Sequence, residues 1–131
     1  MGEAIVPGQI SIVFETLTVP AELNDSPCAQ KVLQALPVQG RVSTWGEEIY
    51  FSIGLALELS DAARSEMSVG EIGYWPAGQA LCIFFGRTPA SGSDGEPRAA
   101  SDVEPIGRAI GPTDALKNVA DGQKVVVSGD S

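Results

Sequence analysis

The apolar positions of this chain fall into short runs with a period of two, which is the spacing of β-strands. The first run covers Gln9–Leu17. Its residues Ile10, Ile12 and Phe14 occupy alternate positions, as in a strand with one buried face. Comparable runs predict a strand that ends at Trp45 and another that begins at Glu47 or Glu48 and ends at Ile53. They also predict four later strands, over Gly70–Trp75, Ala80–Phe85, Val103–Ile110 and Lys124–Ser128. We therefore expect six to eight short strands.

One segment has the pattern of an amphipathic helix. Ser26 followed by Pro27 is a helix start, because a serine side chain caps the first turn and proline fits the first helical position. Apolar residues then recur on one face until Pro37 ends the pattern, which predicts a helix over Pro27–Leu36. A second, short helix is expected over Thr113–Asn118.

Three segments are predicted to connect these elements. Pro76-Ala77-Gly78 joins two aromatic-rich strands as a tight turn, in which Gly78 is expected to take the positive φ. Residues 55–68 lack clear periodicity and indicate a mostly exposed connection, with Ser60 and Asp61 as candidates to cap a short helical turn. Residues 88–97 are rich in Pro, Gly and Ser and predict a long loop, a feature that often carries function.

A length of 131 residues is typical of one domain, and we interpret residues 1–131 as a single domain with one hydrophobic core. The hydrophobic fraction of 44% and the charged fraction of 19% are ordinary for a globular protein. The fold class is mainly β. Antiparallel strands leave unpaired edges, and closing the sheet into a barrel with helices over its ends removes them.

The charge of the chain excludes one class of partner. Seventeen acidic residues against eight Lys and Arg give a net charge of −9, and the chain has no histidine. Such a charge repels a phosphate backbone, so we expect no nucleic-acid partner. The N-terminus shows no basic stretch leading into an apolar run, and no apolar run reaches the roughly 18 residues that cross a bilayer. We therefore expect no membrane association and a cytoplasmic location.

The two cysteines, Cys28 and Cys82, lie far apart and imply neither a disulfide framework nor a zinc site. Cys82 falls in an apolar strand and is expected in the core. Cys28 falls in the first turn of the predicted helix, where the dipole would lower the pKa of its thiol, although a structural role is the commoner fate of such a residue. Catalytic triads usually need a histidine base, which the chain lacks. No catalytic residue, metal or cofactor is therefore predicted.

Four acidic side chains are candidates for acid–base chemistry or for binding a cation. Glu47 and Glu48 are adjacent in a strand and point to opposite faces, so at most one of them faces a cleft and the two cannot share a glycosidase-like site. Asp94 and Glu96 are candidate ligands for a hard cation, but their loop lacks the ligand spacing of a calcium site. A solvated loop is the better interpretation.

Several strings in the second half of the chain carry a family resemblance. VGEIGYWPAGQALCIFFGRTP from Val69, then VEPIGRAIG and DALKNV, together with WGEEIYFSIG from Trp45, resemble the cyclophilin-like proteins, and most closely the small uncharacterised prokaryotic group of that fold. The strings cover roughly Arg41 to Val127. The resemblance implies a closed antiparallel β-barrel of about eight strands with one to three short helices.

The resemblance implies less about activity. Cyclophilins with prolyl isomerase activity use an arginine in a Phe-His-Arg string, and the region that resembles it here, Trp45 to Phe51, contains no arginine. The matching of Phe85 to the phenylalanine of the proline pocket implies that one pocket wall persists. The tryptophan and histidine that follow in those enzymes have no counterpart. Arg87, Arg98 or Arg108 would have to enter from another segment.

Seven aromatic residues cluster in three adjacent segments, and this clustering has two interpretations. Small barrels fill their interiors with large side chains, which accounts for about half of the set. The others would form a shallow apolar groove with polar anchors at its rim, lined by Trp45, Glu48, Tyr50, Trp75, Gln79, Phe85 and Arg98. Three functions follow as hypotheses. They are binding of a small molecule or peptide, which we favour, a weak or diverged prolyl isomerase, and a protein interaction domain.

Overall fold

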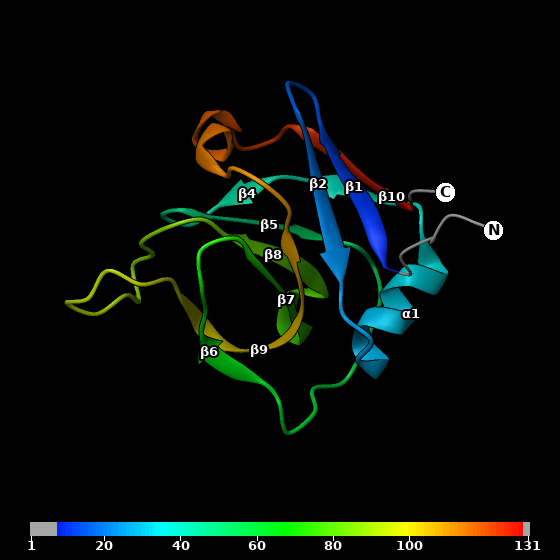
Figure 1. The fold of residues 1–131 in the computed structure, drawn as a ribbon, viewed down its shortest axis with the longest axis horizontal. Helices are drawn as coiled ribbons and strands as arrows, with labels where there is room; N and C mark the ends of the chain where they lie inside the picture. The colour runs from blue at the N-terminus through cyan, green and yellow to red at the C-terminus, as the bar shows by residue number, and fades with distance from the viewer. Residues whose placement is uncertain (1–7, 130–131) are drawn as a thin grey trace.

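The computed structural model describes residues 8–129, which form ten β-strands, one α-helix and two short 3-10 helices (Figure 1). The first half of the chain holds β1 (Gln9–Phe14), β2 (Thr18–Leu23), α1 (Pro27–Ala35), β3 (Val38–Arg41), β4 (Ser43–Thr44), β5 (Glu48–Ser52) and β6 (Arg64–Glu66). The second half holds β7 (Glu71–Trp75), η1 (Pro76–Gly78), β8 (Ala80–Phe84), β9 (Arg98–Ala109), η2 (Asp114–Asn118) and β10 (Lys124–Gly129).

The strands form one antiparallel sheet that curls into an open barrel. Its order is β3-β10-β1-β2-β9-β7-β8-β5-β4, and β6 pairs separately with β9. The predicted barrel is thus only partly confirmed, because the edge strands are not joined by hydrogen bonds along this path. The edge strand β3 instead approaches β5, the neighbour of the other edge strand, since a Cβ placed on Gly40 of β3 would lie only 2.5 Å from the carbonyl oxygen of Ser52 on β5. A glycine is required where two backbones approach this closely.

The main hydrophobic core fills the barrel. It follows from strand alternation, because every second residue of each strand points inward. The largest fully buried side chains of this interior are Tyr74, Phe51, Ile10, Ile12, Ile49, Ile72, Leu81, Ile83, Ile106 and Leu116. The hydroxyl of Tyr74 reaches the connection between β5 and β6, where it accepts a hydrogen bond from the amide of Leu57 and donates one to the carbonyl of Leu55.

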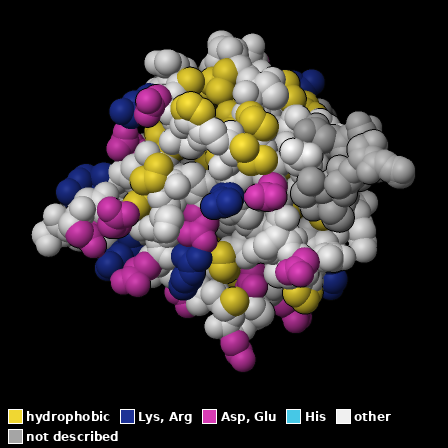
Figure 2. Space-filling view, in the orientation of Figure 1, with side chains coloured by type: hydrophobic (Ala, Val, Ile, Leu, Met, Phe, Trp, Pro, Cys, Tyr) yellow, Lys and Arg dark blue, Asp and Glu magenta, His cyan; other side chains and the backbone are white. Residues whose placement is uncertain are grey.

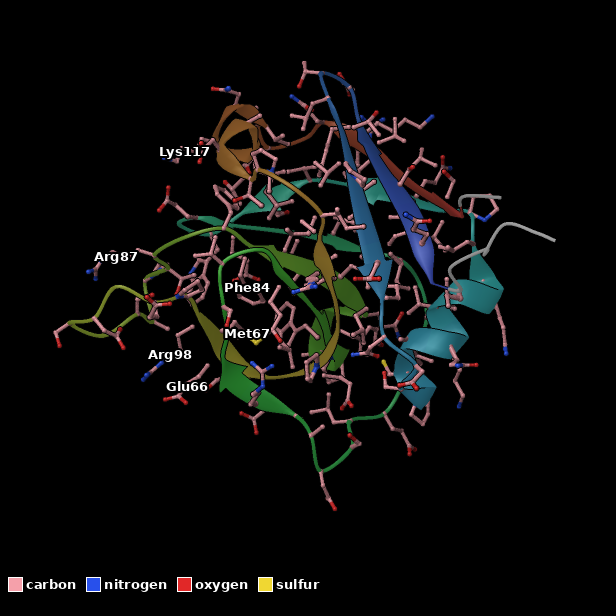
Figure 3. The ribbon with its side chains drawn as sticks, in the orientation of Figure 1. Glu66, Met67, Phe84, Arg87, Arg98 and Lys117 are labelled. Carbon is pink, nitrogen blue, oxygen red and sulfur yellow. The ribbon has the colours of Figure 1, made fainter. Side chains whose placement is uncertain are left out.

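A second, smaller apolar cluster lies on the outer face of the sheet. It consists of Met67, Cys82, Phe84, Ala99 and Val103, with Tyr50 and Trp75 packed against it. The first half of β9 and its partner β6 cover this face (Figure 1). Met67 and Phe84 lie between β6 and β8 in Figure 3.

Gly73 on β7 allows the covering strand to approach. A Cβ at this position would lie 2.7 Å from the Cγ2 atom of Val103. The sheet therefore has a packed apolar cluster outside the barrel as well as a core inside it. The sequence had led us to expect one core only. The contact between Gly73 and Val103 joins residues 30 positions apart in two strands that also pair by hydrogen bonds.

Helix α1 confirms the predicted Pro27–Leu36 helix to within one residue. The hydroxyl of Ser26 accepts a hydrogen bond from the amide of Ala29 at 3.3 Å, as expected of an N-cap. The helix buries Cys28, Ala29 and Val32 against the main core. Thr113 precedes η2 but makes no side-chain cap there.

Two predictions were wrong, one at the turn between β1 and β2 and one at the turn between β7 and β8. The predicted strand Gln9–Leu17 ends at Phe14 and turns directly into β2, a strand that the pattern did not reveal, because the turn at residues 15–17 contains no Gly, Pro or Asn and β2 itself contains a proline. In the turn before β8, the positive φ of 47° belongs to Gln79 and not to Gly78. Gly78 instead makes room for the Trp75 ring, which a Cβ would approach to 2.8 Å.

The connection between β5 and β7, residues 55–68, has more structure than predicted and contains β6. Ser60 does begin a turn, since its carbonyl accepts a hydrogen bond from the amide of Ala63 at 3.1 Å. The buried carboxylate of Glu104 anchors this turn by accepting hydrogen bonds from the amide of Ser60 at 2.7 Å and from its hydroxyl at 2.6 Å. The predicted loop of residues 88–97 is present and projects at the left of Figure 1.

Charged side chains of both signs are interspersed on the face shown in Figure 2. Arg64 pairs with Glu71 across the ends of β6 and β7. No helix within residues 8–129 is long and apolar enough to cross a membrane. Residues 1–7, which carry the expectation that no targeting segment is present, lie outside the described residues.

Candidate functional site

A cavity of about 170 Å³ opens on the outer face of the sheet, beside the second apolar cluster. Its floor comes from β5, β7 and β8, and its far wall comes from the first residues of β9. The residues that line it are Trp45, Glu48, Tyr50, Trp75, Cys82, Ala99, Ala100, Ser101 and Val103. Four of the seven predicted site residues are therefore brought together here.

Strand register explains why these side chains share one face. Glu48 and Tyr50 are two residues apart in β5, so both point out of the barrel. Tyr50 lies opposite Cys82 of β8, which in turn lies opposite Gly73 of β7. Trp75, two residues beyond Gly73, points to the same face. The intervening residues of these strands, such as Ile49, belong to the main core.

Two aromatic rings form a corner of the cavity. The rings of Tyr50 and Trp75 have centroids 6.0 Å apart and planes at 85° to each other. The Trp75 indole is held from two further sides, because its Nε1 donates a hydrogen bond to the Ser101 hydroxyl at 2.9 Å and its benzene ring lies over Gly78. The corner is therefore built before any ligand arrives, which reduces the entropy that binding must remove.

The third aromatic residue, Trp45, is placed by the turn between β4 and β5. Trp45 and Glu48 exchange backbone hydrogen bonds, at 2.9 Å from the Trp45 amide and 3.2 Å from the Glu48 amide. Gly46 takes a φ of 61° inside this turn, a conformation that glycine adopts readily. A Cβ on Gly46 would also lie 2.8 Å from the Pro89 ring, so the long loop packs against the turn.

Glu48 is the one acidic residue of the lining set. Its side chain is buried, with an exposed fraction of 5%, and its Oε1 atom has no hydrogen-bond partner among the described residues. Burial raises the pKa of its carboxyl group from 4.5 to about 7, while a hydrogen bond with the Cys82 side chain acts in the opposite direction. A buried oxygen without a partner is rare in folded proteins and calls for an explanation.

Glu47 confirms the prediction that the two adjacent glutamates face opposite sides. Its Oε1 accepts a hydrogen bond from the amide of Arg87 at 3.2 Å, and its Oε2 lies 4.0 Å from the ammonium nitrogen of Lys117. The two carboxylates thus lie in different surroundings. Only Glu48 reaches the cavity.

The other three predicted site residues do not line this cavity. Gln79 ends η1, where its backbone carbonyl accepts a hydrogen bond from the amide of Ile53 at 2.9 Å. Phe85 packs against the main core on the opposite face of the sheet. Arg98 forms a 3.3 Å ion pair with Glu66, and the two side chains lie together on the outside in Figure 3.

Cys82 and four residues of β9 form a wall of the cavity that the sequence pattern did not predict. Alternation places Cys82 on the same face as Phe84, but it does not tell whether that face or the face of Phe85 points outward, so Cys82 could not be assigned to the site. Ala99, Ala100 and Ser101 carry no comparable signal, since this stretch lacks apolar alternation and the strand was expected to begin only at Val103.

The remaining candidate chemistries find no support in the described residues. Of the arginines considered for isomerase activity, Arg87 donates to the carbonyl of Gly92 at 3.2 Å and Arg108 lies 3.8 Å from a Glu22 oxygen. No cluster of three or more metal-ligating side chains occurs in residues 8–129. Asp94 accepts a hydrogen bond from the amide of Glu96 and so stabilises its own loop.

Cys28 does not have the lowered thiol pKa that its place in the helix suggested. Its side chain is buried, and this burial, with the nearby carboxylate of Glu104, raises its pKa from 9.0 to about 11. The charge of Lys31 has the opposite effect but does not outweigh them. The effect of desolvation on the thiol pKa of Cys28 therefore outweighs the effect expected from the helix dipole.

A second hollow of about 380 Å³ adjoins the cavity on the other side of the aromatic corner. It shares Tyr50 and Trp75 with the cavity. Its other lining residues are Gly40, Arg41, Ser43, Phe51, Ser52, Gly78 and Ala80. The corner is therefore accessible from two sides.

Comparison with known proteins extends the picture beyond this chain. Residues 8–128 match the model of the family described as Cyclophilin-like. Among solved structures, the chain is similar to the hypothetical protein AF2241 from Archaeoglobus fulgidus, with 38% sequence identity and a TM-score of 0.80. The match covers 99% of this chain and 100% of that one. No curated protein matches.

Proposed function

The chain belongs to the cyclophilin-like family, and from this starting point we propose that it binds a small organic molecule in the cavity formed by Glu48, Tyr50 and Trp75. The family match and the similarity to AF2241 confirm the resemblance inferred from the sequence. Neither names a ligand, so the proposal is supported by the geometry of the cavity alone.

The observation that supports the proposal most directly is the orphaned carboxylate oxygen of Glu48. A buried polar atom without a partner destabilises the folded state by roughly 1–3 kcal/mol, and a ligand with a hydrogen-bond donor would remove that penalty. The rest of the wall is mainly apolar and aromatic. An apolar cavity with one convergent polar group is the usual composition of a small-molecule site.

The size of the cavity limits the ligand. A volume of about 170 Å³ is close to that of the roughly 150 Å³ engineered cavity known to hold benzene. The buried part of the ligand would therefore be about the size of one six-membered ring. A larger ligand would extend past the aromatic corner.

The second hollow favours a peptide as the other candidate ligand. A peptide could place one side chain in the cavity and lay its backbone over Gly78 and Ala80, on the far side of Trp75. Prolyl isomerisation gains no such support. Rotation about a prolyl bond crosses a barrier of about 20 kcal/mol, which a positioned donor or cation lowers, and Glu48 supplies the opposite charge.

The chain offers its own reporter for a binding test. It contains two tryptophans, and both line the cavity, so intrinsic fluorescence reports on this site directly. We would titrate a panel of ring-sized fragments, including amines, alcohols and carboxylic acids, and follow both tryptophan emission and thermal stability. Saturable emission changes with a rise in melting temperature are expected for at least one fragment.

A matched pair of variants ties such binding to the cavity. Ala100→Phe adds a ring at the exposed edge of the cavity wall and should abolish fragment binding. Ala120→Phe adds the same ring at an exposed position outside the lining set and should leave it intact. If no fragment saturates the wild-type protein, or if Ala100→Phe binds as the wild type does, the proposal is wrong.

A further inference from the structure

We infer that the group held in this cavity is an alkylated ammonium that keeps one N–H, the positive end of a tertiary amine. The inference rests on the proposed function and names its ligand class. Three aromatic side chains and one buried carboxylate line the same small space. Neither a neutral nor an anionic ligand uses all four.

The aromatic corner suits a cation that carries alkyl groups. The faces of aromatic rings are electronegative and attract cations. Because Tyr50 and Trp75 meet edge to face with their planes at 85°, we place the alkyl groups in the angle that the two rings enclose. Trp45 adds a third aromatic surface from the β4–β5 turn.

Glu48 supplies the countercharge and the hydrogen-bond acceptor. The described lining set includes no lysine or arginine that could neutralise this carboxylate. Its Oε1 atom has no partner, so one N–H from the ligand would satisfy the carboxylate and pair its charge. A quaternary ammonium would pair the charge but donate no hydrogen bond.

The remaining wall argues against a primary amine. A primary ammonium has three N–H donors and loses them all from water on entering the cavity. Ala99, Ala100 and Val103 offer only apolar side chains at the wall, and the Ser101 hydroxyl already accepts from Trp75. Alkyl groups in place of two of the hydrogens would contact this apolar wall.

The decisive experiment compares two molecules of the same shape. N,N-dimethylaminoethanol is protonated at pH 8, and 3-methylbutan-1-ol replaces its ammonium by a neutral carbon. Tryptophan fluorescence titration should show at least about tenfold tighter binding of the amine. Ethanolamine and choline, which have three and no N–H donors on nitrogen, should both bind more weakly than the tertiary amine. Equal affinity for the amine and the alcohol, or for the amine and choline, would overturn the inference.

Variants separate the local charge from the net charge of −9, which attracts cations in general. Glu48→Gln should reduce the preference for the amine over the alcohol by about tenfold. Glu47→Gln removes the same charge one residue away on the opposite face and should preserve the preference. A preference that survives in Glu48→Gln contradicts the inference.

A second variant pair keeps the test usable if Glu48→Gln fails to fold. Trp45→Leu removes one aromatic surface and should lower amine affinity severalfold. Trp45→Phe keeps a ring at this position and should largely restore it. Equal amine affinities in the two variants would contradict the aromatic contribution.

The pH dependence gives an independent readout. With the Glu48 pKa near 7, the ionised fraction falls about tenfold between pH 8 and pH 6, and amine affinity should fall with it. The other titratable groups on the cavity wall are the hydroxyl of Tyr50 on β5 and the buried thiol of Cys82 on β8, whose pKa is raised further by burial. Affinity that does not change over this interval would contradict a role for the carboxylate.

The same ammonium could come from a free amine or from a side chain. A tetrapeptide with a dimethyllysine residue tests the second source, and tighter binding than that of the free amine would assign the ligand to a peptide. Weaker binding would assign it to a small amine. If instead neutral fragments bind and amines have no advantage, the proposed function stands and this inference fails. If nothing binds, both fail.

Discussion

The indole nitrogen of Trp75 donates a hydrogen bond of 2.9 Å to the hydroxyl of Ser101, 26 residues further along the chain. The bond connects the end of β7 with the first half of β9 across the wall of the cavity. It fixes one plane of the aromatic corner that Trp75 forms with Tyr50. The corner thus depends on a contact between two separate strands.

Ser101→Ala should loosen this corner. We expect a loss of at most about 1 kcal/mol in the free energy of unfolding, because the hydrogen bond is partly exposed. Tryptophan emission should shift to the red, and affinity for any cavity ligand should fall severalfold. Ser93→Ala, at an exposed position of the 88–97 loop, is the control. Unchanged emission in Ser101→Ala would show that the bond does not position the ring.

Glu48→Gln should change how stability depends on pH. The pKa of Glu48 is raised from 4.5 to about 7 in the folded state, so the folded protein holds a proton in this interval that the unfolded chain has released. The contribution of Glu48 to stability is therefore largest below pH 4.5 and is lost as pH rises through 7. Relative to wild type, the variant should gain up to about 3 kcal/mol between pH 4.5 and pH 8.

Urea unfolding at pH 4.5, 6 and 8 would measure this difference. Glu47→Gln provides a control with the same change of charge outside the cavity. A stability difference between Glu48→Gln and the wild type that stays constant over the three pH values would refute the raised pKa.

Gly73→Ala should displace the strand that covers the outer cluster. The new methyl group would lie 2.7 Å from the Cγ2 atom of the buried residue Val103, so one of the two strands must move. Overpacking of this kind typically costs about 1 to 3 kcal/mol. Thermal unfolding would measure the loss. The double variant Gly73→Ala with Val103→Ala should recover part of it, and an equally unstable double variant would argue against this contact.

Both cysteine thiols should be unreactive in the folded protein. Burial raises the pKa of Cys28 to about 11 and that of Cys82 well above its usual value. For Cys28 the thiolate fraction at pH 8 would be about a hundredfold smaller than in the unfolded chain, and limited access slows both residues further. Ellman's reagent should therefore detect two thiols in urea and almost none without it. Rapid labelling of one native thiol would contradict this description.

Much of the fold could be predicted from local patterns. Ser26 and Pro27 marked the start of α1 correctly, because capping depends on neighbouring residues only. Strand alternation also placed Glu47 and Glu48 on opposite faces. The β1–β2 turn escaped prediction because backbone hydrogen bonds close it, including one of 2.8 Å from Phe14 to Leu17, without a typical turn residue.

Prediction of the site was limited by what alternation leaves open. It requires that Phe84 and Phe85 point to opposite faces, but it does not say which of them faces outward. Phe84 lies in the outer cluster and Phe85 packs on the main core, so Phe85 does not line the cavity that holds four of the other predicted site residues. The barrel closure, which is incomplete, was likewise beyond the reach of local patterns.

The sequence by itself determined the β-rich class, the helix, the position of the β7–β8 turn and the aromatic residues that could form a site. These features depend on residues close together in the chain, where spacing fixes which side chains share a face. Only the tertiary structure decided that β6 and β9 fold over the outside of the sheet, and this folding buries Glu48 without a partner for Oε1. The physical reason is that this folding depends on long-range pairing and packing, such as the contact of Val103 with Gly73, which neither residue reveals alone.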